Sequence, residues 1–303
     1  MSRFIVIKRK DIILYSLLTI LFLFVWIVLI TTLRSNYTFS QVNEAINSND
    51  KYDLNGDGLS ENLIQYKNGN YYSFEIKTPT SNYKLKDYYD NYLTLDINLK
   101  FKPKITYLDL NRDNIPEIII NGLKNDKPVT YIYTWQRDNY YNILFTDDNL
   151  YGILNSNNSK TPKFLYTLSN KGDESTKGII LCNNTIKDLT AYKIKIPSLS
   201  IMQKFIDLIQ LPYELDDAPG IFTPTISSDE LSLLWNLDKE SIKYSFLSGY
   251  FYDTSWNDKG TPTSIMWILS FQKDNGNNVS ELILNIKVDL DEFGEYKISS
   301  IQK

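Results

Sequence analysis

Hydrophobic and polar positions follow three successive patterns along the chain. Residues 12–33 contain no charged residue. Between 51 and 195, short apolar runs alternate with turns rich in Asn, Asp and Gly, as is typical of β-strands and hairpins. After residue 197, apolar residues first recur at helical spacing and then alternate over four longer runs. The pattern predicts an N-terminal transmembrane helix, a mainly-β domain and a small α+β domain.

The uncharged run is long enough to cross a bilayer. At about 1.5 Å per residue a helix over 12–33 spans roughly 30 Å of hydrocarbon. Four basic residues precede the run: Arg3, Lys8, Arg9 and Lys10. The positive-inside rule then makes 1–11 a cytoplasmic tail, 34–50 a spacer, and everything beyond extracytoplasmic. A cleaved signal peptide is disfavoured, because the run exceeds a usual h-region and no small-residue cleavage site follows. We expect a single-pass plasma-membrane protein.

The stretch 53–61, which reads DLNGDGLSE, places oxygen-bearing side chains at its positions 1, 3, 5 and 9. These residues are Asp53, Asn55, Asp57 and Glu61. Calcium takes six to eight oxygen ligands, and the backbone carbonyl of Leu59 supplies a further one at position 7. Glycines at positions 4 and 6 permit the positive φ that such a curled loop needs. The alternative is a tight hairpin turn without metal, because turns use the same residues.

A second copy, DLNRDNIPE, occupies 109–117. It predicts a second calcium site with these ligands: Asp109, Asn111, Asp113, the carbonyl of Ile115, and Glu117. Both glycines are missing, and Arg112 stands at position 4. A third stretch at 169–177 keeps only Asp173, and Lys177 replaces the closing Glu, so we expect no metal there.

The two loops resemble the D-x-[DN]-x-D-G-x-x-[DE] loops of FG-GAP/VCBS-type β-propeller repeats. The resemblance covers about 45–195 and implies calcium-stiffened blades of antiparallel strands on extracellular or cell-surface proteins. Loop copies recur at a period near 60 residues, as expected for a repeat architecture. Propellers close with four or more blades, whereas three units are found here. The expected fold of 51–195 is therefore an incomplete, propeller-like set of about three units. Weak calcium affinity suits an extracellular location, where the ion is abundant.

The region 197–303 is expected to form a separate α+β domain. Its helical face contains Met202, Phe205, Ile206 and Ile209, and capping boxes are predicted at Ser200 with Gln203 and at Ser227 with Glu230. Four strands are predicted at 242–252, 264–273, 279–288 and 296–301, with a hairpin turn at 274–277. Helices followed by a meander resemble the ketosteroid-isomerase-like α+β fold. Three tryptophans, Trp235, Trp256 and Trp267, either line a pocket of that fold or fill its core.

Composition narrows the function. The 303 residues include no histidine and one cysteine, Cys182, which excludes Ser-His-Asp and Cys-His catalysis, histidine-ligated zinc and an internal disulfide. The net charge of −4 without a basic patch argues against nucleic acid. We expect a non-enzymatic, membrane-anchored extracytoplasmic binding or scaffold protein of the bacterial cell envelope, with Ca²⁺ as cofactor and an envelope protein or glycan as ligand. Two alternatives remain: a subunit of an envelope assembly with vestigial repeats, and a carboxylate-based cell-wall glycan hydrolase.

Overall fold

The computed structural model describes residues 52–98, 101–154, 163–168, 176–182, 185–189, 196–212 and 218–303. Contacts divide the chain into two compact units, 1–45 and 46–303, and all described residues belong to the second. The predicted tail, membrane segment and spacer (1–50) lie outside the described residues. Within the described ranges, no helix has both the length and the apolar character needed to cross a membrane.

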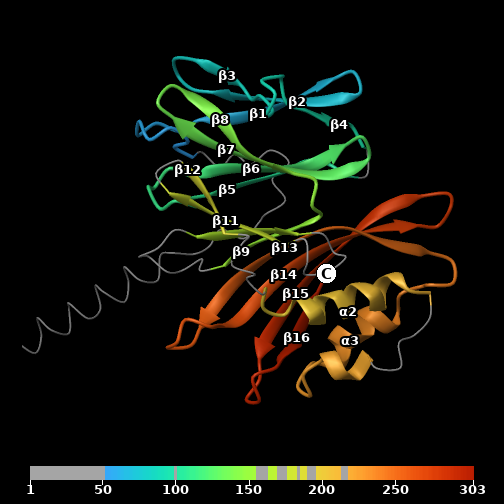
Figure 1. The fold of residues 1–303 in the computed structure, drawn as a ribbon. Coiled ribbons are helices and arrows are strands. Elements are labelled where there is room, and N and C mark those ends of the chain that lie inside the picture. The colour runs from blue at the N-terminus through green and yellow to red at the C-terminus, as the bar shows by residue number, and fades with distance from the viewer. Residues whose placement is uncertain are drawn as a thin grey trace, which may run out of the picture. The chain divides into compact units, whose positions relative to one another are not determined.

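Two four-stranded antiparallel sheets come first (Figure 1). The first sheet consists of β1 (Asn62–Asn68), β2 (Tyr71–Lys77), β3 (Asn82–Lys84) and β4 (Thr94–Asp96), with β1, β3 and β4 all paired to β2. The second is a meander of β5 (Lys104–Leu108), β6 (Glu117–Lys124), β7 (Lys127–Gln136) and β8 (Asn139–Thr146). Asn68-Gly69-Asn70, residue types typical of a tight hairpin turn, forms the β1–β2 connection, with Gly69 at φ 60°.

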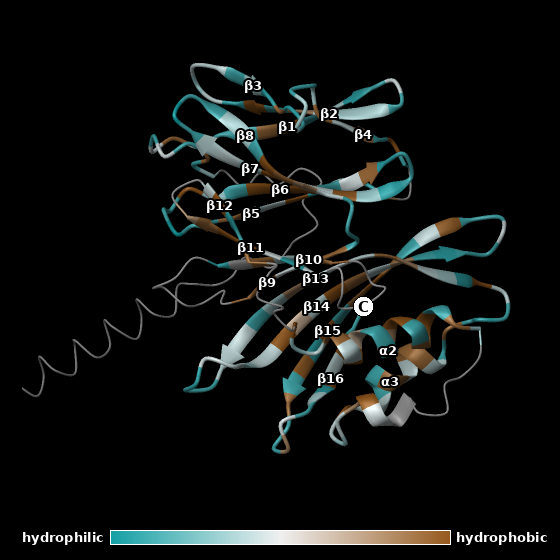
Figure 2. Cartoon of the chain, in the orientation of Figure 1, coloured by the Kyte–Doolittle hydropathy of each residue, from teal (hydrophilic) through white to brown (hydrophobic). Residues whose placement is uncertain are grey.

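The two sheets share one hydrophobic core. Phe74, Ile76 and Leu95 of the first sheet are buried in one cluster with Ile118 and Tyr131 of the second. At the contact of β4 with β6, a Cβ on Gly122 would lie 2.6 Å from Leu95 Cδ1, so a larger residue there would displace the buried Leu95 side chain. Figure 2 shows the apolar residues concentrated on the strands and the polar ones at the turns. Consecutive residues of β6 and β7 are buried, so the middle of the second sheet is covered on both faces.

The third sheet has eight strands and joins the two halves of the chain. Its order is β12-β11-β10-β9-β13-β14-β15-β16. The strands are β9 (Leu150–Leu154), β10 (Phe164–Leu168), β11 (Lys177–Cys182), β12 (Thr185–Asp188), β13 (Lys243–Trp256), β14 (Pro262–Asp274), β15 (Val279–Leu290) and β16 (Tyr296–Gln302). β9 and β13 pair in parallel, whereas the other neighbours are antiparallel. Lys104 Nζ of β5 lies 2.9 Å from Glu281 Oε1 of β15 and links the second sheet to the third.

Helices cover one face of the β13–β16 part of this sheet (Figure 1). They are α2 (Leu199–Gln210), the short 3-10 helix η3 (Ala218–Ile221) and α3 (Ser228–Trp235). The predicted apolar face of α2 is confirmed, because Met202, Phe205, Ile206 and Ile209 are all buried. The capping box of Ser227 with Glu230 is confirmed at the start of α3. That of Ser200 with Gln203 is wrong: α2 begins directly after Ser198, which makes no side-chain cap and instead accepts a hydrogen bond from Trp267 Nε1.

The predicted fold class is wrong in two respects. The strands of the expected third unit, β10 to β12, do not form a third blade, and the C-terminal strands do not form a separate α+β domain. Both sets belong to one eight-stranded sheet, because β9 pairs with β13 although helices and loops separate the two strands in the sequence. The Asn- and Ser-rich stretch 150–163 predicts a loop, whereas β9 forms at Leu150–Leu154. The described part of the chain is therefore a mainly-β structure of three sheets with two α-helices.

The three tryptophans do not line a common pocket. Trp267 is fully buried and stacks on Phe251, with ring centroids 4.4 Å apart. Trp256 donates from Nε1 to Asp253 Oδ2 at 2.5 Å. Trp235, at the end of α3, is 53% exposed. The core-filling interpretation thus holds for Trp267.

Candidate metal centre

The two Asp-rich loops occupy equivalent places in the first two sheets. Loop 1 (53–61) leads into β1, and Tyr52 and Glu61 on its two sides pair as an isolated antiparallel bridge. Loop 2 (109–117) connects β5 to β6, where Leu108 pairs with Glu117. Each loop thus closes a hairpin, with the last glutamate at the start of the outgoing strand.

Side chains of loop 1 hold its backbone in a curl. Asp53 Oδ1 accepts from Gly56 N at 2.6 Å, and Asp53 Oδ2 accepts from Gly58 N at 2.8 Å. Asn55 Oδ1 accepts from Asp57 N at 2.8 Å. The Asn55 amide nitrogen donates to Asp57 Oδ2 at 3.2 Å and to Glu61 Oε1 at 3.3 Å. The four predicted ligand side chains are therefore mutual neighbours in the structure.

Loop 2 repeats the contacts made by the first aspartate and by the asparagine to the second aspartate. Asp109 accepts from Arg112 N at 2.6 Å and from Asn114 N at 3.1 Å. Asn111 Oδ1 accepts from Asp113 N at 2.9 Å, and its amide donates to Asp113 Oδ2 at 2.9 Å. Arg112 and Asn114 adopt φ of 65° and 70°, close to the 79° and 84° of Gly56 and Gly58. The carboxylate at position 1 therefore imposes the same left-handed backbone on a loop that lacks glycine.

The closing glutamates are the buried groups of the two loops. Glu61 and Glu117 are each 1% exposed. Glu61 Oε2 accepts from Leu54 N at 2.6 Å, and Glu117 Oε2 accepts from Leu110 N at 2.7 Å. Burial raises the pKa of Glu61, and the charges of Asp57 and Asp53 raise it further. Burial, reinforced by Asp113 and Asp109, raises the pKa of Glu117 to about 8. A cation beside either carboxylate would offset this cost of burying negative charge.

A buried hydroxyl lies close enough to loop 1 to sense its charge. Tyr140 of β8 is 4% exposed, and its hydroxyl makes no hydrogen bond within the described part of the chain. Its pKa is raised by burial and then by the negative charges of Glu61, Asp53 and Asp57, with Tyr83 contributing as well. Buried hydroxyls are normally hydrogen-bonded, so this group marks a place where a polar partner belongs.

The two loops also touch each other. A Cβ on Gly56 would lie 2.6 Å from Ile115 Cδ1, so position 7 of loop 2 packs directly over position 4 of loop 1. The rings of Tyr52 and Tyr107, which precede the two loops, lie 4.5 Å apart. A change of conformation in one loop therefore alters the packing of the other.

Basic side chains distinguish loop 2 from loop 1. Lys163 N donates to Leu110 O at 3.0 Å, which brings Lys163 to loop 2. Burial lowers the pKa of both Lys163 and Arg112, while the charge of Asp109 acts to raise both values. The negative charge of Asp253 in β13 also acts to raise the pKa of both basic groups. In contrast, the side-chain charges that shift the pKa of Glu61 are those of Asp57 and Asp53.

The predicted ligands are thus brought together, but not as a ready-made metal shell. Within the described ranges, no group of three or more Asp, Glu, Cys or His side chains is arranged to hold a metal ion. The physical reason is visible in the hydrogen bonds, since the Asn55 amide stands between two carboxylates of loop 1. In the third stretch, 169–175 lie outside the described residues, and Lys177 Nζ lies 3.5 Å from Asp148 Oδ2.

The sequence prediction missed Tyr140 and Lys163 as neighbours of the loops. It placed Arg112 inside loop 2, where this residue replaces a glycine of the repeated pattern. Tyr140 and Lys163 carried no signal in the sequence, because each reaches its loop only through the stacking or pairing of segments distant in sequence.

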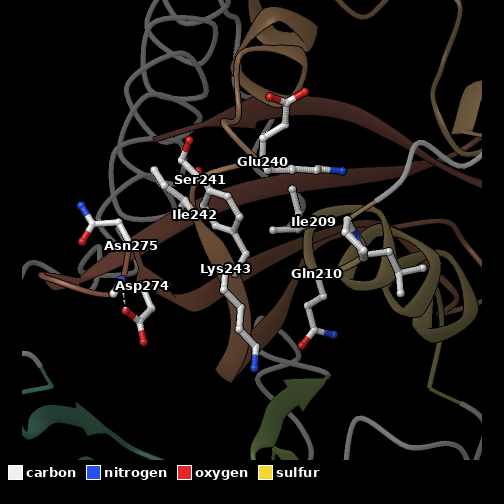
Figure 3. Close-up of a pocket in the computed structure, with 13 residues that line it drawn as sticks. Ile209, Gln210, Glu240, Ser241, Ile242, Lys243, Asp274 and Asn275 are labelled. Atoms are coloured by element: carbon white, nitrogen blue, oxygen red, sulfur yellow. Dashed lines mark hydrogen bonds between the residues drawn. The ribbon is translucent and has the colours of Figure 1, made fainter.

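A hollow of about 560 Å³ lies between the end of α2, residues 239–244 and the β14–β15 turn. Figure 3 shows the carboxylate of Glu240 and the ammonium of Lys243 pointing away from each other. Gln210 Oε1 accepts from Phe246 N at 2.8 Å, and Lys239 Nζ donates to Leu208 O at 2.6 Å. These polar groups stabilise the fold rather than converge on a ligand, so the loops remain the better candidate.

No protein-family model, curated protein or solved structure matches the chain. The fold and the loops alone therefore define the class: a mainly-β protein whose first two sheets carry equivalent Asp-rich loops in contact.

Proposed function

We propose that the chain is a membrane-anchored, extracytoplasmic binding or scaffold protein whose first two sheets are stabilised by calcium. The observation that carries the proposal is the pair of buried glutamates, Glu61 and Glu117, at the same position of two loops with matching hydrogen bonds. A cation bound at either loop would offset the cost of its buried negative charge and so stabilise the folded state.

The donor set suits calcium, which prefers carboxylate, amide and carbonyl oxygens. Loop 1 would hold it with Asp53, Asn55, Asp57, the Leu59 carbonyl and Glu61. Loop 2 would use Asp109, Asn111, Asp113, the Ile115 carbonyl and Glu117. When bound, the ion supplies positive charge and ligand-binding energy to the folded state. The chain's own residues curl the backbone, bury the closing carboxylate and hold the amide between the acids.

Loop 1 is the stronger site in this proposal. Its two glycines adopt positive φ without steric cost. Loop 2 is the weaker site, because Arg112 and Lys163 already oppose its negative charge and a calcium ion must compete with them.

The membrane location rests on the sequence. The uncharged stretch 12–33 follows a basic N-terminus, and calcium loops of weak affinity serve best outside the cytoplasm. Cell fractionation followed by alkaline extraction checks it: the chain should stay with the membrane pellet and be cleaved by protease added to intact cells. Release into the soluble fraction would contradict it.

Thermal unfolding of the purified full chain, with calcium and with chelator, tests the function. At calcium concentrations of ten to a hundred times Kd, linkage predicts a stabilisation of about 2 kcal/mol. Asp57→Ala should abolish most of the shift. The matched control is Asp274→Ala, which removes a turn carboxylate that accepts from Gly276 N at 2.8 Å and should leave the shift intact. An unchanged midpoint in the unmodified chain would remove calcium from the account.

A further inference from the structure

The hairpin between β3 and β4 exposes three aromatic rings. This tyrosine tip (residues 85–93) reads LKDYYDNYL. Tyr88, Tyr89 and Tyr92 are 75%, 80% and 60% exposed. Tyr88 and Tyr89 stand edge to face, with centroids 5.7 Å apart and an interplanar angle of 89°. Tyr88 and Tyr89 contribute little burial to the fold, because most of their surface stays exposed.

The backbone under the rings is fixed. Leu85 and Leu93 are buried in the core of the first two sheets and anchor both ends of the tip. Asp87 Oδ1 accepts from Tyr89 N at 2.9 Å and from Asn91 N at 3.0 Å, and Asp87 N donates to Asn91 O at 2.7 Å. A preorganised backbone lowers the entropy that a ligand must overcome on binding.

The charges of the tip are already neutralised. Lys86 Nζ lies 2.8 Å from Asp90 Oδ1, and Asp87 Oδ2 lies 3.6 Å from Lys124 Nζ. The tip contains no other Asp, Glu, Lys or Arg. Lys84 Nζ of β3 lies over the Tyr92 ring, 5.2 Å from its centroid, so the most open aromatic faces of the tip are those of Tyr88 and Tyr89. These two rings, the phenol hydroxyls and the Asn91 amide carry no charge. A complementary ligand is uncharged and has both apolar C–H faces and hydroxyl groups.

The exposed area of the three rings distinguishes a protein partner from a carbohydrate ligand. At 150–250 Å² for a fully buried tyrosine, the three exposed rings offer roughly 300–550 Å². A standard protein interface buries about 800 Å² on each partner. The rings are too small a surface for a stable protein complex, but they match a few sugar rings, whose C–H faces stack on aromatic faces while their hydroxyls take hydrogen bonds.

We infer that the tyrosine tip is a binding site for an uncharged polysaccharide. This inference names the ligand class of the binding role proposed above and rests on that role. It does not depend on calcium, because neither loop contributes a residue to the tip.

The test is calorimetric titration of the detergent-solubilised full chain with chitohexaose and cellohexaose, in calcium and in chelator. Hyaluronan oligosaccharide serves as the anionic comparison. In a Tyr88→Ala/Tyr89→Ala double variant, affinity for the neutral hexamers should fall at least about tenfold, because two stacking rings are lost. Tyr88→Phe should keep most of the affinity, since the ring face remains.

The matched control is Tyr141→Ala, which removes a 46% exposed tyrosine of β8 outside the tip and should bind as the unmodified chain does. Retained unfolding midpoints show that all variants fold. The inference is overturned if neither neutral hexamer binds, if the double variant binds them unchanged, or if hyaluronan binds more tightly. Binding that persists in chelator while calcium gives no shift in unfolding upholds the tip and contradicts only the calcium proposal.

Discussion

Loops 1 and 2 have the same backbone and opposite surroundings. Both curl around an aspartate at position 1 and end in a glutamate that is 1% exposed. Loop 1 uses glycine at positions 4 and 6, and its neighbours are acidic or phenolic. Loop 2 uses Arg112 and Asn114 and shares its charge with Lys163. The hydrogen bonds accepted by Asp53 and Asp109 therefore determine the loop conformation, whereas residues in and around each loop determine how far its negative charge is balanced.

Position 4 is under different constraints in the two loops. Glycine is required there in loop 1 for two reasons: Gly56 has a φ of 79°, and an added Cβ would lie 2.6 Å from Ile115 Cδ1. At the same position of loop 2 a long basic side chain is accepted, at the backbone cost of a left-handed L-residue. Position 4 of loop 1 is thus fixed by contact between the loops, whereas position 4 of loop 2 is able to carry charge.

The largest expected effect is the pH dependence that Glu117 confers in chelator. Its folded pKa of about 8 lies above the ordinary 4.5, so the folded state favours the protonated carboxyl. Its contribution to stability is full below pH 4.5 and is lost as the pH rises through about 8. Across this window the free energy of unfolding should fall by roughly 5 kcal/mol relative to Glu117→Gln, which has no such proton to lose.

Urea unfolding of both proteins across the window measures the difference. Glu61→Gln should show the same sign with a smaller size, because the pKa of Glu61 is raised by the same causes. If the unmodified chain instead gained stability relative to Glu117→Gln as the pH rises, the proposed cost of burying the charged Glu117 carboxylate would be contradicted.

The second-largest expected loss of stability follows removal of the aspartate that begins each loop. Asp53→Ala and Asp109→Ala each remove a charged acceptor of several backbone N–H groups, at a cost of about 2 kcal/mol in chelator. In calcium the cost should grow more for Asp53→Ala than for Asp109→Ala. Urea midpoints in both buffers measure it, and equal growth would remove the distinction between the loops.

Gly56→Ala should destabilise by about 1.5 kcal/mol, from strain at positive φ and from the contact with Ile115. The double variant Gly56→Ala/Ile115→Ala should show a coupling, because the second change removes the side chain that the first one meets. Thermal unfolding of the four members of this cycle measures the coupling. If the two changes in unfolding free energy simply add, the side chain of Ile115 does not restrict the space at Gly56.

Arg112→Gly gives the smallest change in stability, below about 1 kcal/mol, because relief of backbone strain offsets the loss of charge beside Asp109. Its informative effect is on binding: loop 2 should take calcium more tightly once one of its basic neighbours is gone. Arg112→Lys, which keeps the charge, is the matched control. Unchanged calcium affinity in Arg112→Gly would contradict the competition proposed for loop 2.

Local features of this fold could be predicted from the sequence. The turn at 68–70, the capping box of Ser227 and the curl of both Asp-rich loops depend on residues a few positions apart. The apolar face of α2 follows from helical spacing. These elements are predictable because side chains close in sequence determine them.

Long-range features could not be predicted in this way. The parallel pairing of β9 with β13 joins Leu150 to Gly249, and nothing in either segment specifies the other. This pairing merges the expected third blade and the expected separate domain into one sheet. In the candidate site, the Tyr140 hydroxyl and the basic Lys163 likewise arrive from other strands or connections, and the exposed tyrosine tip depends on which residues the sheets leave uncovered.

Calcium titration calorimetry of the unmodified chain beside Asp57→Ala and Asp113→Ala tests the central claim most directly, because these residues hold position 5 of the two loops. We expect a stronger and a weaker binding event, with the stronger lost in Asp57→Ala and the weaker lost in Asp113→Ala. Absence of binding heat in the unmodified chain, or loss of the stronger event in Asp113→Ala alone, would contradict the account.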